Sequence, residues 1–227
     1  MKSTWIVALL LNLSLLASTG AVWANTRELP QVTEDGLHRV PDSKMAIVYA
    51  EPGADLAQYK RVKLLDAYVA FKKNWARTQR SRSANPLSVT SKDMERIKNS
   101  LAQEFHDVFK KTLEDGGYEV VDESAEDVLL VRPAIINLDV TAPDTPHAGR
   151  STTYTSSAGE MTLYIELFDS VTGAMIAKAL DRRVDNASRS GFYTWANSVT
   201  NKAAADRILR GWASILLDAL NEARQSR

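Results

Sequence analysis

A single apolar stripe between Thr90 and Asp115 constrains the fold more than any other feature of the sequence. Large apolar side chains recur there at steps of three and four residues, which predicts a long amphipathic helix. They are Met94, Ile97, Leu101, Phe105, Val108, Phe109 and Leu113. Thr90 and Asp93 can form a capping box at its start, and a Gly-Gly pair follows it.

A hairpin is the clearest β-structure in the sequence. Residues 160–183 form it: apolar and polar side chains alternate over 160–167, and the turn DSVTG follows, in which Gly173 can adopt a positive φ. If Phe168 pairs with Ala174, Leu167 opposes Met175 and large residues meet small ones on the face that a helix would cover.

Further apolar runs predict strands at 45–50, 59–71, 118–121 and 128–140, and a second amphipathic helix at about 200–224. The apolar parity changes within 59–71, which indicates a β-bulge. Pro133 lacks an amide donor and indicates an edge, a bulge or a strand start. The order predicts an α+β fold with a mainly antiparallel sheet of about five strands and two long amphipathic helices packed on one face.

The first 24 residues have the layout of a secretory signal peptide, with Lys2, an apolar run over 5–17 and then small residues. We expect cleavage between Ala24 and Asn25 and a periplasmic mature chain; a buried N-terminal helix is the alternative. The apolar run is shorter than the about 20 residues of a transmembrane helix, and no later segment reaches that length.

The chain contains no cysteine, and Thr19 stands where a lipoprotein signal would need one. We therefore expect no lipid anchor and no disulfide. After the signal peptide (1–24), residues 25–45 form an extended lead-in and residues 46–227 a single α+β domain.

The charges are unevenly spread, although the formal net charge is zero. Residues 60–82 contain eight Lys or Arg and one acid, whereas 114–127 contain seven acids and no base. The overall balance argues against nucleic acid as a partner. The asymmetry indicates either two solvated surfaces or a polar surface that pairs with a partner or with another copy.

No recognisable catalytic or metal-binding motif is present. The three histidines lack metal-ligand spacing, there is no nucleophile motif, and no phosphate-binding loop matches. Glu160 and Glu166 would lie roughly 20 Å apart on one hairpin face, too far for a carboxylate pair. We predict no catalytic residues, metal or cofactor, with a site built from Asp139, Asp169 and Asp181 as the remaining enzymatic alternative.

Two surface segments are candidate binding sites. A basic loop is expected at 72–88, and an aromatic cluster surrounds Gly191. Their candidate residues are Trp75, Arg77, Arg80 and Arg82 in the first, and Arg189, Phe192, Tyr193 and Trp195 in the second. In the alternative interpretation Trp75 folds under its loop, and the second segment packs over the end of the sheet.

Three stretches carry a family resemblance: VYAEPGADLAQYKRVKLLDAYVAF, SAGEMTLYIELFDSVTGAMIAKALDRR and ILRGWASILLDAL. Together they resemble domain of unknown function 3313, a proteobacterial family described as lipoproteins of the Gram-negative envelope, over roughly Asp35 to Ala223. The resemblance implies an envelope protein and brings no catalytic residues. Thr19 departs from the lipoprotein pattern.

We therefore expect an exported periplasmic protein that binds another envelope component without catalysing a reaction. Its partner would be an envelope protein or an anionic envelope ligand, and peripheral contact with the outer membrane stays open. The first alternative is a carrier or sensor of a small or lipidic anionic ligand. The second is an enzyme with an unrecognised carboxylate site.

Overall fold

The computed structural model describes residues 29–82, 89–140, 153–155, 159–184, 194–196 and 198–226. Within these residues the helices are α1 (Trp75–Arg82), α2 (Ser91–Asp115), α3 (Ser198–Gln225) and the short 3-10 helix η1 (Leu56–Gln58). The strands are β1 (His38–Arg39), β2 (Ile47–Ala50), β3 (Arg61–Leu64), β4 (Tyr68–Phe71), β5 (Glu119–Val120), β6 (Val128–Val140), β7 (Thr153–Thr155), β8 (Gly159–Asp169), β9 (Met175–Val184) and β10 (Thr194–Ala196).

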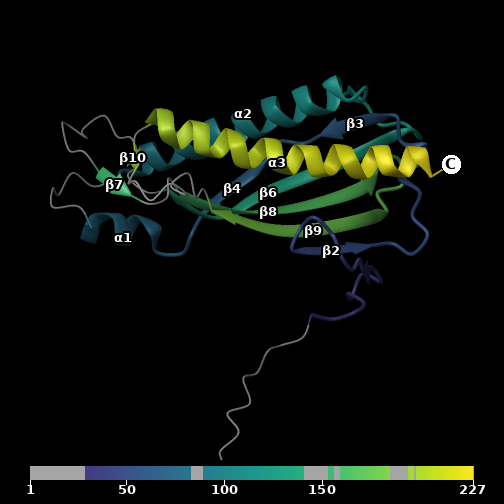
Figure 1. Ribbon diagram of the computed structural model, residues 1–227, viewed down its shortest axis with the longest axis horizontal. Helices are drawn as coiled ribbons and strands as arrows, with labels where there is room; N and C mark the ends of the chain where they lie inside the picture. The colour runs from purple at the N-terminus through teal and green to yellow at the C-terminus, as the bar shows by residue number, and fades with distance from the viewer. Residues whose placement is uncertain are drawn as a thin grey trace, which may run out of the picture.

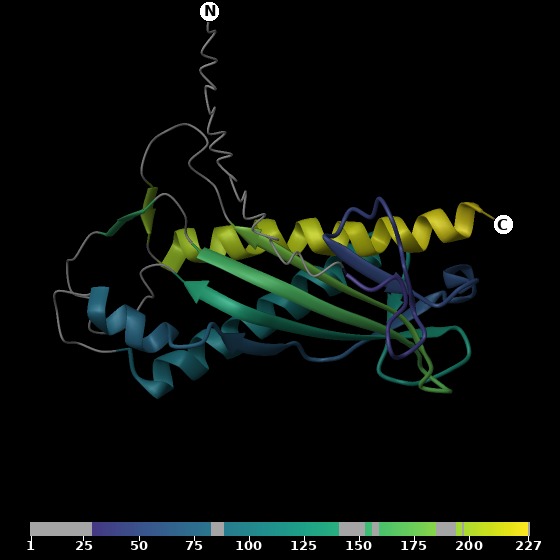
Figure 2. The same cartoon turned by 90° about the horizontal axis from the view of Figure 1, so that it is seen from below.

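The fold is α+β, with α2 and α3 lying over one face of an eight-stranded sheet (Figures 1 and 2). The two helices are in close contact, since a Cβ on Gly116 would lie 2.3 Å from the Leu217 side chain. Both apolar stripes face the sheet. The buried core joins Phe105, Phe109 and Leu113 of α2 to Leu209, Trp212 and Leu220 of α3 and to Val131, Ile135, Leu163 and Ile165 of the strands.

The sheet is mixed, with the order β1-β2-β9-β8-β6-β3-β5 and β4 also paired with β6. The expectation of a mainly antiparallel sheet of about five strands is therefore wrong. β3 and β4 run parallel to β6, because the chain leaves β4, crosses over the sheet in α2 and enters β6 in the same direction. Within the expected lead-in, β1 pairs with β2 and Leu37 is buried.

The predicted capping box of the long helix is confirmed. The Thr90 hydroxyl accepts from the backbone N–H of Asp93 at 3.1 Å, and the Asp93 carboxylate accepts from the Thr90 N–H at 3.0 Å. This reciprocal pair fixes the start of α2.

The hairpin is present, but its register differs by two residues from the expected one. Leu167 opposes Ala177 and Ile165 opposes Ala179, because the turn advances β9 by one residue and a bulge near Ile176 by another. A shift of two keeps every side chain on its face. Large residues therefore still meet small ones beneath the helices.

The parity change within 59–71 is a break between two strands. β3 ends at Leu64 and β4 begins at Tyr68, and both pair with β6. Pro133 lies on β6 between the partners of these strands, since Leu64 opposes Val131 and Tyr68 opposes Ala134. The residue without an amide donor thus occupies the interior of the sheet at a gap in the neighbouring strand.

One extra residue near the end of β6 forms a bulge that sets the geometry of the functional surface. Ile136 opposes Thr162, whereas Asp139 opposes Glu160, so three steps on β6 match two on β8. Asn137 has a φ of 53°, in the left-handed region that asparagine tolerates better than most residues.

We expect Asn137→Val to destabilise the protein by about 1–2 kcal/mol, because a β-branched side chain is strained at positive φ. Asn137→Gly should stay within about 0.5 kcal/mol of the wild type, since glycine has no Cβ. Urea unfolding followed by circular dichroism measures both. Equal stabilities of the two variants would show that the bulge imposes no backbone strain.

Candidate functional site at the end of the sheet

The expected basic loop 72–88 is wrong for residues 75–82, which form α1. Asn74 precedes the helix with a φ of 62°, and its carbonyl accepts from the Thr78 N–H at 3.0 Å. A left-handed residue turns the chain sharply as it leaves β4. The basic sequence is therefore held on a short helix at the end of the sheet.

Trp75 fixes α1 to the sheet. Its side chain is only 3% exposed, stacks on Phe71 with ring centroids 4.2 Å apart, and donates from Nε1 to the Val140 carbonyl at 3.3 Å. Gln79, one turn further, donates to the same carbonyl at 3.0 Å. Trp75 thus serves as an anchor, as in the alternative interpretation, and its ring is not an exposed binding surface.

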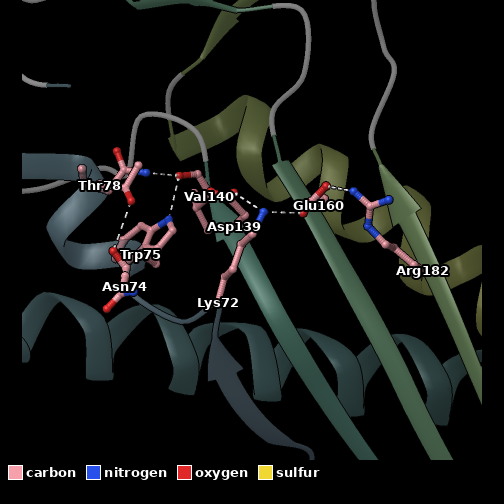
Figure 3. A network of polar contacts seen from close by, with 9 residues as sticks. Lys72, Asn74, Trp75, Thr78, Asp139, Val140, Glu160 and Arg182 are labelled. Carbon is pink, nitrogen blue, oxygen red and sulfur yellow. Dashed lines mark hydrogen bonds and ion pairs between the residues drawn. The ribbon is translucent and has the colours of Figure 1, made fainter. Parts of the chain in front are cut away.

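A cluster of four charged side chains lies beside this anchor (Figure 3). Lys72 Nζ is 3.4 Å from Asp139 Oδ2 and 3.1 Å from Glu160 Oε1, and Arg182 binds the other oxygen of Glu160. The cluster joins β4, β6, β8 and β9. Its two cations balance its two carboxylates.

The bulge at Asn137 brings this cluster together. Without the extra residue Leu138 would oppose Glu160, and Asp139 would point toward the helices. With it, Leu138 is 4% exposed in the core and Asp139 faces Lys72 on the other side of the sheet.

The surroundings of Glu160 favour its charged form. Burial opposes ionisation, but the hydrogen bonds from Lys72 and Arg182 outweigh it and hold the pKa of Glu160 below its ordinary 4.5. The hydrogen bond to Glu160, with that to Asp139, raises the pKa of Lys72. Lys72 is therefore engaged within the protein.

Other cations of the α1 region remain exposed. Lys73 and Arg77 are exposed, and neither forms an ion pair within the part of the chain that the structure describes. Arg80 and Arg82 belong to the same helix, and their side chains lie outside the described residues. We refer to Lys73, Arg77, Arg80 and Arg82 as the basic set of α1.

The second predicted cluster lies mostly outside the described residues. This applies to Arg189, Phe192 and Tyr193. Trp195 belongs to β10, where its backbone pairs with Tyr154 of β7, and its side chain is also outside the description. The role predicted for these four residues stays a prediction.

The three acids of the enzymatic alternative do not share a site. Asp139 opposes Glu160 at one end of β8, and Asp169 ends that strand nine residues later, roughly 30 Å away. Asp181 faces the helices, where its carboxylate accepts from Trp212 Nε1 at 2.8 Å.

Asp169 instead holds the hairpin turn. Several donors bind the Asp169 carboxylate, and the hydrogen bond from the Thr172 N–H contributes most. Together they keep the pKa of Asp169 below its ordinary value, although burial acts in the opposite direction. These donors include the Tyr59 hydroxyl at 3.1 Å. Each of the three acids is thus engaged in a separate structural contact.

No group of three or more His, Cys, Asp or Glu among the described residues is arranged to hold a metal ion. None of the helices within the same residues is long and apolar enough to span a bilayer.

Fold and site together define an α+β protein in which two long helices cover a mixed sheet and a basic helix is anchored at one end. The model of the family described as "Protein of unknown function (DUF3313)" matches residues 32–216. The chain belongs to this family, as its sequence motifs indicated. No curated protein sequence matches it.

Several solved structures show a distant likeness. A PelC dodecamer from Paraburkholderia phytofirmans is 12% identical, with a TM-score of 0.34, over 72% of this chain and 95% of that one. A DUF4136 family protein from Bacteroides thetaiotaomicron is 11% identical, with a TM-score of 0.35, over 75% and 94%. A DUF330 protein from Xanthomonas campestris is 13% identical, with a TM-score of 0.36, over 74% and 87%. These scores are too low to support an argument about function.

Sequence reasoning named Asp139 and Glu160 but did not find that Lys72 joins them in one cluster. The bulge that brings Asp139 to Lys72 lies near the end of β6, so it changes the alternation of apolar and polar residues only over the last few positions of the strand. Asn137 was the available signal, because asparagine tolerates a left-handed backbone.

We expect Glu160→Gln to destabilise the protein by about 1–3 kcal/mol at neutral pH, because it weakens two charge-assisted hydrogen bonds. A depressed carboxyl pKa contributes stability above its ordinary value, 4.5 here, and that contribution is lost as pH falls through the lower folded value. The difference from wild type should therefore shrink in acid, as measured by urea unfolding across pH.

The matched control is Glu95→Gln. Glu95 is 62% exposed and, among the described residues, its one ion pair is with Lys98, so the change should cost less than about 0.5 kcal/mol. A Glu160→Gln penalty that is unchanged at low pH would contradict the electrostatic origin.

Proposed function

We propose that this protein is an exported, non-enzymatic component of the cell envelope that binds an acidic partner through the basic set of α1. The observation that carries the proposal is a basic helix fixed to the sheet by a buried tryptophan. Trp75 is only 3% exposed, while Arg77, two residues later, is exposed and has no ion pair among the described residues.

A fixed helix favours binding over simple solvation. Two donors, Trp75 Nε1 and Gln79 Nε2, converge on the Val140 carbonyl, so the backbone that carries Arg77 is ordered before any partner arrives. Preorganised charged groups lose less conformational entropy on binding. They also accelerate encounter with a partner of opposite charge.

The proposed location rests on residues 1–24. A positive start, a short apolar run and small residues before Asn25 form a signal peptide that export machinery removes. The absence of cysteine from the sequence excludes thioether lipidation, so contact with a membrane would be peripheral.

A small or lipidic anionic ligand is the competing occupant. Its binding surface would have used Lys72 together with the arginines, yet Lys72 is engaged by Asp139 and Glu160. This favours an acidic protein surface, which needs only the outward cations.

We expect Arg77→Glu to abolish recovery of a protein partner from gently cross-linked envelopes, with the tagged protein at native level and mass spectrometry as the readout. The charge change repels an acidic surface and leaves Trp75 in place. Lys60→Glu is the matched control, because Lys60 is exposed just before β3, at the other end of the β6 pairing.

A partner retained equally by both variants would remove α1 from the proposal. Recovery of phospholipid or lipopolysaccharide instead of protein, lost in Arg77→Glu, would favour the anionic-ligand alternative.

We expect the processed protein to begin at Asn25, as measured by the intact mass of material released from the periplasm. Ala24→Tyr should leave the precursor uncleaved, because a signal peptidase accepts only small residues at this position. A full-length product in the cytoplasmic fraction of wild-type cells would refute export.

A further inference from the structure

We infer that the acidic partner of α1 is the opposite end of a second copy of this chain. We call this surface the acidic end and define it as residues 114–127. The inference rests on the proposed function, since it names the partner of the same basic set. It follows from the placement of charge at the two ends of the molecule.

The acidic end keeps carboxylates without an ion pair in the part of the chain that the structure describes. Arg61 pairs with Glu123 and Asp127, while Lys110 and Lys111 pair with Glu114 and Asp115 along α2. The three that remain exposed and without an ion pair are Glu119, Asp122 and Glu126.

The acidic end also lies at the negative ends of both long helices. α2 ends at Asp115, and the C-terminal part of α3 lies against it, with the Arg224 guanidinium 3.7 Å from the Tyr118 ring centroid. The two helices are thus parallel, and their macrodipoles point the same way.

The acids at the end of α2 are not explained by stability. Its last turn carries two acids, Glu114 and Asp115, and no base, which is the unfavourable arrangement for a helix C-terminus. The pairs with Lys110 and Lys111 also have the weaker order, with lysine on the N-terminal side. A surface that keeps negative charge against the local preference is suited to a cationic partner.

The two charged surfaces cannot meet within one copy. β6 begins directly after Asp127 and ends at Val140, whose carbonyl holds α1, so its 13 residues separate them by about 40 Å. Figure 1 shows the C-terminal end of α2 and α1 at opposite ends of the molecule. The separation of about 40 Å exceeds the Debye length of about 8 Å at physiological salt.

A contact between different surfaces of two identical copies is head-to-tail. Each copy keeps one free basic end and one free acidic end, so association continues into a ring or an open chain. Because exposed charges dominate the contact, it should be sensitive to salt.

The test is sedimentation velocity of the purified protein over a range of concentrations. We expect larger species at about 20 mM salt, and association weakened about tenfold or more at about 500 mM. Two variants separate the surfaces: an acidified α1 (Lys73→Glu with Arg77→Glu) and a basified acidic end (Asp122→Lys with Glu126→Lys). Each variant alone should remain monomeric.

An equal mixture of the two variants should associate again, because each surface then meets one of opposite charge. Asp107→Lys, an exposed charge reversal on α2, is the control that should associate like wild type. Circular dichroism and thermal unfolding of each variant exclude misfolding as the cause of a lost contact.

Two results would overturn the inference: a wild-type protein that stays monomeric at low salt, or association that ignores the charge changes. If the monomeric protein still recovers an envelope partner in an Arg77-dependent way, the proposed function stands and its partner is a different protein. If self-association is confirmed but no other partner appears, the basic set serves assembly alone.

Discussion

Both layers and both ends of the molecule depend on the pairing of the 13-residue strand β6. It pairs with β8 along its length, and β3 and β4 follow one another along its other edge. Because these two strands are parallel to β6, the chain must cross the sheet between them, and α2 is that crossover. The length of one strand therefore sets the distance between the basic α1 and the acidic end.

The bulge near Asn137 couples the core to the charged cluster. One extra residue turns Leu138 into the core and Asp139 toward Lys72, and neither outcome can occur without the other. The cluster it assembles is neutral and internally paired. It therefore acts as the support of the sheet end, and Lys73 and Arg77 beyond it are exposed.

The sequence predicted the elements that depend on local periodicity. The α2 stripe, its capping box and the hairpin faces follow from spacing over a few residues, and all three are present. The parallel pairing of β3 and β4 with β6 could not be predicted from local spacing, because it depends on which edge of β6 is free when the chain returns to the sheet. α1 was missed because only two of its eight residues, Trp75 and Ala76, are apolar, and they form no apolar stripe. The contact that holds α1 in place, from Trp75 to the Val140 carbonyl, exists only in the folded sheet.

The direction of the helices gives the charge asymmetry a structural cause beyond side chains. α2 and α3 are parallel, so their negative C-terminal ends lie together beside the acidic end, and their positive N-terminal ends point toward the end that carries α1. Parallel dipoles repel one another, and apolar burial between the helices and the sheet must outweigh that repulsion. Side-chain charge could have offset the dipoles, as Arg224 does at the end of α3. At the end of α2 the acidic side chains add to the negative end of the dipole instead. Negative charge therefore gathers at one end of the molecule and positive charge at the other, along the direction in which copies would join.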